Sequence, residues 1–125
     1  MSNKEIIINK KLEELSKSKF RSSFHLRKYM IKYIDEKGMD TIKKHTIDFI
    51  NQKLAPAYIE NDGHQTPMKG HPVFIAQHAC ACCCRTCIEK WHGIPKGREL
   101  NKNEKNYIYY LLIKWIELEY NKKEN

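Results

Sequence analysis

Apolar residues recur every three or four positions along most of this chain, and polar residues fill the places between them. This spacing puts the apolar side chains on one face of an α-helix. It predicts helices over residues 8–15, 26–37, 40–55 and 101–120. Because no segment shows the alternation typical of a strand, we expect an all-α fold: a single compact domain of about five helices.

Residues that start or stop helices stand at the ends of these patterns. Gly38 follows the second pattern, as glycine does where the chain turns left-handed after a helix. Asp40 can cap the next helix, and Pro56 ends it. Asn101 and Glu104 are spaced as in a capping box and predict the start of the last helix.

The chain of 125 residues is long enough for one hydrophobic core. With 41% hydrophobic and 30% charged residues, its composition is that of a globular protein. We expect one domain over residues 1–125. Its parts are an N-terminal helix or arm (1–19), a basic helical pair (20–57), a loop with a Cys/His-rich segment (58–100) and a C-terminal helix (101–120).

Turn-forming residues interrupt residues 55–71, so we expect a long irregular loop there. A loop of this length inside a compact domain is uncommon, and it is either functional or a mobile connector. Several of its polar side chains could converge on a ligand. They are Asp62, His64, Gln65, Thr66 and Lys69.

All five cysteines and four of the six histidines lie within residues 61–100. An odd number of cysteines packed so closely cannot form a spread-out disulfide framework. In a reducing compartment such thiols are metal ligands, redox thiols or buried core residues. Thiolate and imidazole are also the side chains that bind zinc best. The residues concerned are Cys80, Cys82, Cys83, Cys84 and Cys87, with His64, His71, His78 and His92.

The Cys/His-rich segment fits two helical arrangements. In the first, one helix runs from Pro72 to Trp91 and buries the cysteines as a stripe in the core. The opposite face of this helix could then form a ligand-binding or catalytic surface. It carries His78, Arg85, Glu89 and His92.

In the second arrangement the helix breaks near residues 79–82 and another helix begins near Cys83. Cys84 and Cys87 then form a C-x-x-C pair in its first turn. Two thiols so placed can reach one ion, and the N-terminus of the helix favours their thiolate forms.

The other ligands of such an ion must come from nearby side chains. His92 can join only if the second helix ends beside it, and Gly93 favours such an end. Either His78 or Cys83 would complete the shell. A buried thiol stripe and a redox dithiol remain as alternatives. The zinc site predicted by this arrangement consists of His78, Cys83, Cys84, Cys87 and His92.

The net charge of +8 is carried mainly by the N-terminal half. Residues 1–57 have 13 Lys and Arg against 7 Asp and Glu, which gives +6. A basic surface suits nucleic acid or another polyanion, although a solvated lysine-rich surface produces the same pattern.

No apolar run is long enough to span a bilayer. The first residues lack the apolar core and the cleavage site of a signal peptide. We therefore expect a cytoplasmic protein with no membrane partner.

Two strings in this region resemble a bacterial family of unknown function, domain-of-unknown-function family 4186. They are NDGHQTPMKGHPVFIAQHA (61–79) and CCRTCIEKWHGIPKG (83–97). The resemblance extends from about Phe20 through the C-terminal helix and implies no activity and no catalytic residues. It argues against Cys80 and Cys82 as ligands, because threonine is usual at both positions. The matching positions are His71, His78, Cys83, Cys84, Cys87, Lys90, Trp91 and His92.

Two functions are compatible with these observations. The first is a small zinc-binding helical protein that binds nucleic acid or another polyanion. The second is a small metal-dependent hydrolase, with His78, Arg85 and Glu89 as candidate base, anion clamp and acid. A structural zinc site is closed by four protein ligands, whereas a catalytic one keeps a position open to water. The number of protein ligands therefore distinguishes the two functions.

Overall fold

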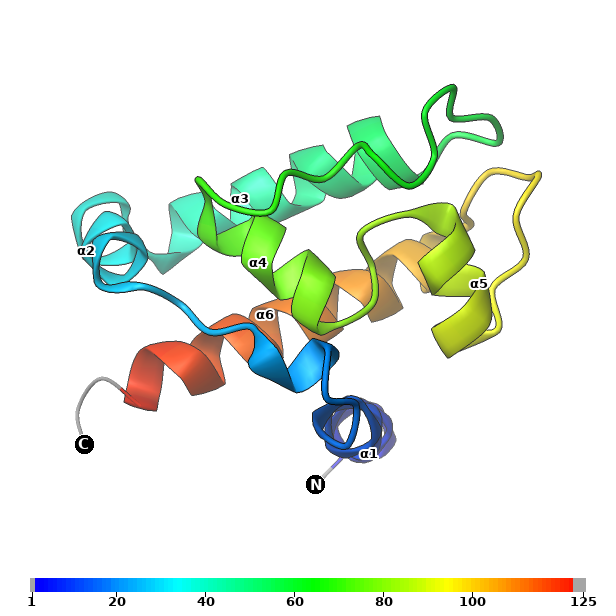
Figure 1. Cartoon of the computed structure of the whole chain (residues 1–125). Coiled ribbons are helices and arrows are strands. Elements are labelled where there is room, and N and C mark those ends of the chain that lie inside the picture. Colours follow the sequence, from blue (N-terminus) through cyan, green and yellow to red (C-terminus); the bar gives the residue numbers. More distant parts are fainter. Residues whose placement is uncertain (1, 123–125) are drawn as a thin grey trace.

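The computed structural model of the chain describes residues 2–122, which form helices joined by loops (Figure 1). No strand is present among these residues, so the predicted all-α fold is confirmed. Over the same residues, no helix has both the length and the apolar character needed to cross a membrane. The elements in chain order are α1 (Asn3–Ser16), the 3-10 turn η1 (Arg21–Ser23), α2 (Lys28–Lys37), α3 (Met39–Phe49), the π-helical turn η2 (Ile50–Leu54), α4 (Pro72–Ala79), α5 (Arg85–His92) and α6 (Lys102–Lys122).

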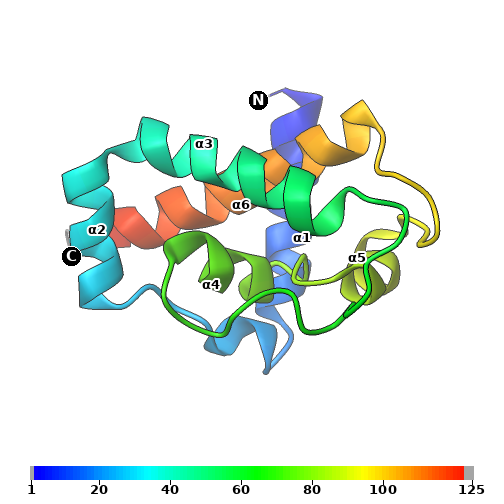
Figure 2. The same cartoon turned by 90° about the horizontal axis from the view of Figure 1, so that it is seen from above.

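The long helix α6 lies at the centre of the molecule. Helices α1, α3 and α4 all pack against it, and the two views show it running between them (Figures 1 and 2). Full burial of each large aliphatic side chain stabilises the fold by roughly 1.5–3 kcal/mol, so the buried face of α6 anchors the core. The residues of this face are Ile108, Leu111, Leu112 and Ile116.

Most predicted helix ends agree with the structure to within about two residues. The predicted start at residue 8 was wrong, because Ser2 caps α1 and the helix begins at Asn3. The Asn101 side chain accepts from the Glu104 backbone N–H at 2.8 Å, and the Glu104 carboxylate accepts from that of Asn101 at 2.9 Å. Gly38 ends α2 with a φ of 85°. The prediction that Asp40 caps α3 was wrong, because the helix already begins at Met39 and Gly38 occupies the N-cap position. Asp40 lies instead in the first turn.

Helix α3 does not stop at its last α-helical residue but continues into η2. There the backbone N–H of Ala55 donates to the carbonyl oxygen of Ile50, five residues earlier, at 2.8 Å. The helical conformation ends just before Pro56, as predicted, because proline cannot continue it.

The Cys/His-rich segment forms two short helices, so the second of the two arrangements is confirmed. Helix α4 ends at Ala79 and α5 begins at Arg85. Between them Ala81 has a φ of 57°, a value incompatible with a continuous right-handed helix. Helix α5 ends at His92, where Gly93 turns left-handed with a φ of 69°.

Candidate metal centre

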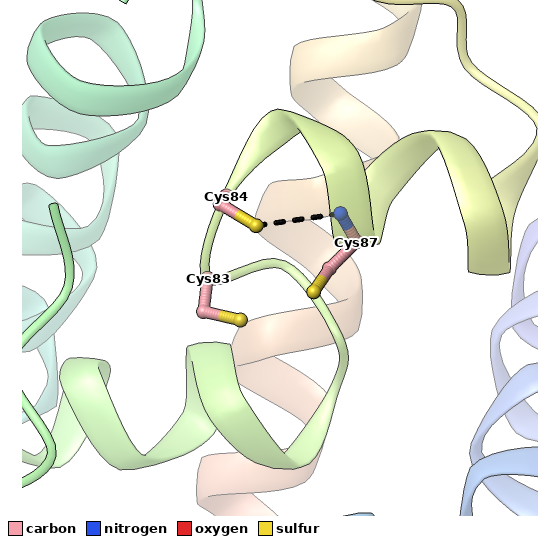
Figure 3. A group of neighbouring side chains, drawn as sticks. All are labelled: Cys83, Cys84 and Cys87. Carbon is pink, nitrogen blue, oxygen red and sulfur yellow. Dashed lines mark hydrogen bonds between the residues drawn. The ribbon is translucent and has the colours of Figure 1, made fainter. Parts of the chain in front are cut away.

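The sulfur atoms of Cys83, Cys84 and Cys87 all lie within 4.8 Å of one another and form a three-cysteine cluster (Figure 3). Cys83 ends the segment between α4 and α5, and Cys84 is the N-cap of α5. The first turn brings Cys87 back toward Cys84, whose Sγ accepts a hydrogen bond from the Cys87 backbone N–H at 3.4 Å. Three thiols at this separation could hold a metal ion.

The cluster is partly open to solvent. Cys84 is buried, whereas Cys83 and Cys87 are half-buried. Burial raises the pKa of Cys84 to about 12, so this residue is a protonated thiol at neutral pH in the metal-free protein. A bound cation would have to displace that proton, because the thiolate is the form that ligates metals.

A buried arginine covers the cluster from a distant part of the sequence. Arg21 in η1 is only 9% exposed. Its Nη2 donates to the Sγ of Cys87 at 3.3 Å, and its Nη1 lies 3.7 Å from the Sγ of Cys83. Nη1 also donates to the carbonyl oxygen of His78 at 2.8 Å, which fixes the guanidinium in place.

Arg21 remains charged in this buried position. Burial lowers the pKa of its guanidinium, but the hydrogen bonds to Cys87 and Cys83 outweigh this effect and the pKa is raised. Sequence reasoning did not find Arg21 as part of the site. Positions 66 and 62 residues apart meet here only through the fold, and no spacing rule reveals them.

The ring of His78 lies outside the three-cysteine cluster. Its Nε2 is 3.1 Å from the carbonyl oxygens of both Thr66 and Pro67. A carbonyl oxygen only accepts hydrogen bonds, so this nitrogen carries the proton. In the tautomer with its proton on Nε2, the lone pair lies on Nδ1. Phe24 stacks on one face of the ring at 5.4 Å between ring centroids.

His92 also lies outside the cluster, and both of its ring nitrogens are engaged. Nε2 donates to the carbonyl oxygen of Cys80 at 2.8 Å, which leaves Nδ1 to accept from the Tyr107 hydroxyl at 2.7 Å. Burial lowers the pKa of His92 to about 4, so the ring is neutral at pH 7. The roles of His78 and His92 as ligands remain predictions.

Cys80 and Cys82 belong to the hydrophobic core and lie outside the cluster. Both are fully buried, and burial raises the pKa of each thiol well above its usual range. The buried-core interpretation of the cysteines therefore describes these two residues.

Two of the three candidate catalytic residues line one surface cleft. Arg85 and Glu89 border a cleft of about 480 Å³ together with Asp62, and His78 is not among the lining residues. The Arg85 side chain is buried, and burial lowers the pKa of its guanidinium. That guanidinium donates to the carbonyl oxygens of Leu54, Pro56 and Pro95. It joins the end of η2 and the residues that follow it to the segment after α5, which is a structural task.

Asp62 fastens the loop of residues 55–71 to the start of α5. Its Oδ1 accepts from the backbone N–H of Arg85 at 2.8 Å, and its Oδ2 accepts from the backbone N–H and the hydroxyl of Thr86 at 3.1 and 2.8 Å. Burial opposes ionisation of Asp62, but these bonds and one from Gln65 outweigh it and lower the pKa. The carboxylate thus caps the helix that carries the cluster.

A second loop residue fixes the cluster itself. The buried Thr66 donates from its hydroxyl to the carbonyl oxygen of Cys83 at 2.8 Å. The neighbouring loop residues His64 and Lys69 are exposed instead. The loop is therefore a support for the three-cysteine cluster through Asp62 and Thr66.

Fold and site together define an all-helical protein with a three-cysteine cluster that could hold a metal ion. Residues 9–117 match the model of the family DUF4186, which is described as a domain of unknown function. The chain therefore belongs to this family, as its resemblance in sequence predicted. No solved structure matches the chain.

Proposed function

We propose that this protein binds one zinc ion through the thiolates of Cys83, Cys84 and Cys87. The observation that carries the proposal is the separation of the three sulfur atoms, all within 4.8 Å. With zinc–sulfur bonds of about 2.3 Å, the sulfurs of a tetrahedral site lie roughly 3.8 Å apart. Movements of about 1 Å would therefore close the three thiolates around an ion.

His78 is the better candidate for the fourth ligand. Histidines that ligate metals usually donate their other ring N–H to a carbonyl or carboxylate group. His78 does so through Nε2 and keeps the lone pair of Nδ1. By contrast, His92 would have to give up its bonds to Cys80 or Tyr107. A site with four protein ligands would be structural.

Elemental analysis tests the zinc proposal. Protein purified without a chelator is expected to carry about one zinc per chain, and a chelator should lower its melting temperature because metal binding adds to the folding free energy. Cys84→Ser and Cys87→Ser should each lose most of the zinc. Cys80→Ser is the matched control, since it removes a thiol outside the cluster. Wild-type protein without stoichiometric metal would overturn the zinc proposal and leave the cluster as free thiols.

Cobalt substitution tests the fourth ligand. Tetrahedral thiolate-bound cobalt absorbs visible light intensely, and the spectrum changes when one ligand is replaced by water. His78→Ala is expected to change the spectrum and weaken binding by about 10- to 100-fold, as is typical when a group that supports a metal site is removed. His92→Ala should leave the spectrum unchanged. The reverse result would assign the fourth position to His92.

At the level of the whole protein, we infer that the zinc-stabilised fold binds nucleic acid or another polyanion. The charge of +8 supports this function. The alternative, a metal-dependent hydrolase, has weaker support from the site. Arg85 uses Nη1 and Nη2, and His78 uses Nε2, to donate to backbone carbonyl groups. His78 is also not among the residues that line the cleft of Arg85 and Glu89.

A further inference from the structure

Arg21 is buried without an acidic partner. None of the ion pairs between residues 2–122 includes it, although its side chain is only 9% exposed. A buried cation is costly unless a negative charge compensates it. Its guanidinium instead faces two sulfur atoms, those of Cys83 and Cys87. Neutral thiols accept hydrogen bonds from it but carry no charge, whereas thiolates held by a metal ion supply the compensating negative charge.

The charge of the occupied site follows from its ligands. A divalent ion with three thiolates and one neutral imidazole or water carries one net negative charge, after the three thiols have released their protons to the buffer. The single positive charge of Arg21 balances it. A trivalent metalloid such as arsenite reacts differently: As(OH)₃ and three thiols give a neutral arsenic tris-thiolate and three water molecules. Arg21 would then lie uncompensated against a neutral site.

We propose that Arg21 makes the three-cysteine cluster selective for divalent thiophilic ions over trivalent metalloids. It is a positioning residue that acts on the ion through the sulfur atoms of Cys83 and Cys87. This inference rests on the proposed binding of zinc at the cluster. Arg21 bridges two of the three ligands, so it both compensates their charge and fixes their separation.

The test compares the affinities of zinc and of arsenite in wild-type protein, Arg21→Gln and Arg21→Lys, under reducing conditions. Arg21→Gln removes the charge and is expected to weaken zinc binding by about 10- to 100-fold, with a much smaller effect on arsenite. Arg21→Lys retains the charge and should keep most of the zinc affinity. A purely structural role would lower both affinities together, so the ratio of the two is the decisive readout.

The outcomes separate the two proposals. Wild-type protein that binds no zinc would overturn the metal site and this inference with it. If the wild-type protein binds zinc but Arg21→Gln lowers the zinc and arsenite affinities equally, or lowers neither, the selectivity alone is overturned. Far-UV circular dichroism checks the metal-free fold. If Arg21→Gln does not fold, Arg21→Lys decides, because it keeps the charge but cannot bridge both sulfurs as a guanidinium does. It should keep most of the zinc affinity, and an equal loss of zinc and arsenite affinity would show that Arg21 acts only through the positions of the sulfurs and would overturn the selectivity.

Discussion

His71 shows how much a single residue can fix in this fold. Its Nδ1 accepts from the backbone N–H of Val73 at 3.0 Å and so caps α4. Nε2 must then carry the proton of the neutral ring, and it donates to Nδ1 of His45 at 3.0 Å. Tyr33 and Phe49 pack edge-on against the same ring. The N-cap contact of His71 thus requires the neutral form, because a protonated Nδ1 cannot accept a hydrogen bond.

The neutral form of His71 predicts a loss of stability in mild acid. Burial, together with the nearby His45, lowers the pKa of His71 from its usual 6.5 to about 4. Because the pKa is lower in the folded state, the contribution of His71 to the free energy of unfolding is complete above pH 6.5. It is lost as the pH falls toward 4. Protonation also removes the N-cap, worth about 1 kcal/mol. Denaturant unfolding between pH 7 and pH 4 measures this decline.

His71→Asn provides the critical comparison, because asparagine caps a helix without titrating. This variant should lose less stability than the wild type between pH 7 and pH 4, and the remaining decline would reflect His92, whose pKa is also lowered to about 4. His64→Asn makes the same change at an exposed position and should match the wild type. An unchanged pH dependence in His71→Asn would contradict the assigned role.

At the scale of the element, the two ends of α5 are determined by residues within or next to the helix. The contact that holds the helix in place comes from a distant residue. A helix start near Cys83 and a helix end at Gly93 were predicted, because helix starts and left-handed termination depend on a few neighbouring residues; in the structure α5 begins at Arg85 and Cys84 is its N-cap. The contact of Asp62 with this helix could not be predicted. It joins positions 23 and 24 residues apart, and it depends on how the intervening loop folds back.

Removing the Asp62 carboxylate is expected to loosen both the loop and α5. Asp62→Ala leaves two helix N–H groups and one hydroxyl without their acceptor, which costs about 1–3 kcal/mol. The loss should appear in denaturant unfolding and as faster proteolysis within residues 55–71. Because the pKa of Asp62 is lowered, the contribution is present above its usual value of 3.8 and is lost as the pH falls.

Glu60→Ala is the natural control for this experiment, since it removes an exposed carboxylate from the same loop. It should change neither the stability nor the rate of cleavage. Zinc binding by Asp62→Ala should weaken as well, because the same helix presents Cys84 and Cys87. Full stability and unchanged cleavage in Asp62→Ala would show that the loop is held by other contacts.

At the scale of the whole molecule, features formed by residues close in sequence could be predicted, whereas contacts between distant residues could not. The apolar stripe of α6 is a property of consecutive residues and was readable from its period. The three cysteines of the cluster lie within five positions, so their convergence followed from one helix start. Arg21 meets them only because η1 packs against α4. No local pattern contains that contact.

The uneven charge is the other property that belongs to the whole molecule. Exposed lysines occur on α2 and α3, as at Lys28, Lys32 and Lys44, and none of these three takes part in an ion pair within residues 2–122. A charged group without a local counter-ion is free to contact phosphate. The basic half therefore predicts salt-dependent binding that does not depend on base sequence.

Charge reversal on α3 tests polyanion binding. Lys43→Glu with Lys44→Glu should weaken binding to duplex DNA of any sequence, and the slope of log affinity against log salt should fall by roughly 0.9 for each phosphate that these lysines neutralise. Lys90→Glu with Lys102→Glu lowers the net charge equally but in the C-terminal half, so it should weaken binding less. Equal effects of the two pairs would indicate a general response to net charge. No binding by the wild type at about micromolar protein in low salt would favour the hydrolase instead, and His78 and Glu89 would be the first residues to replace.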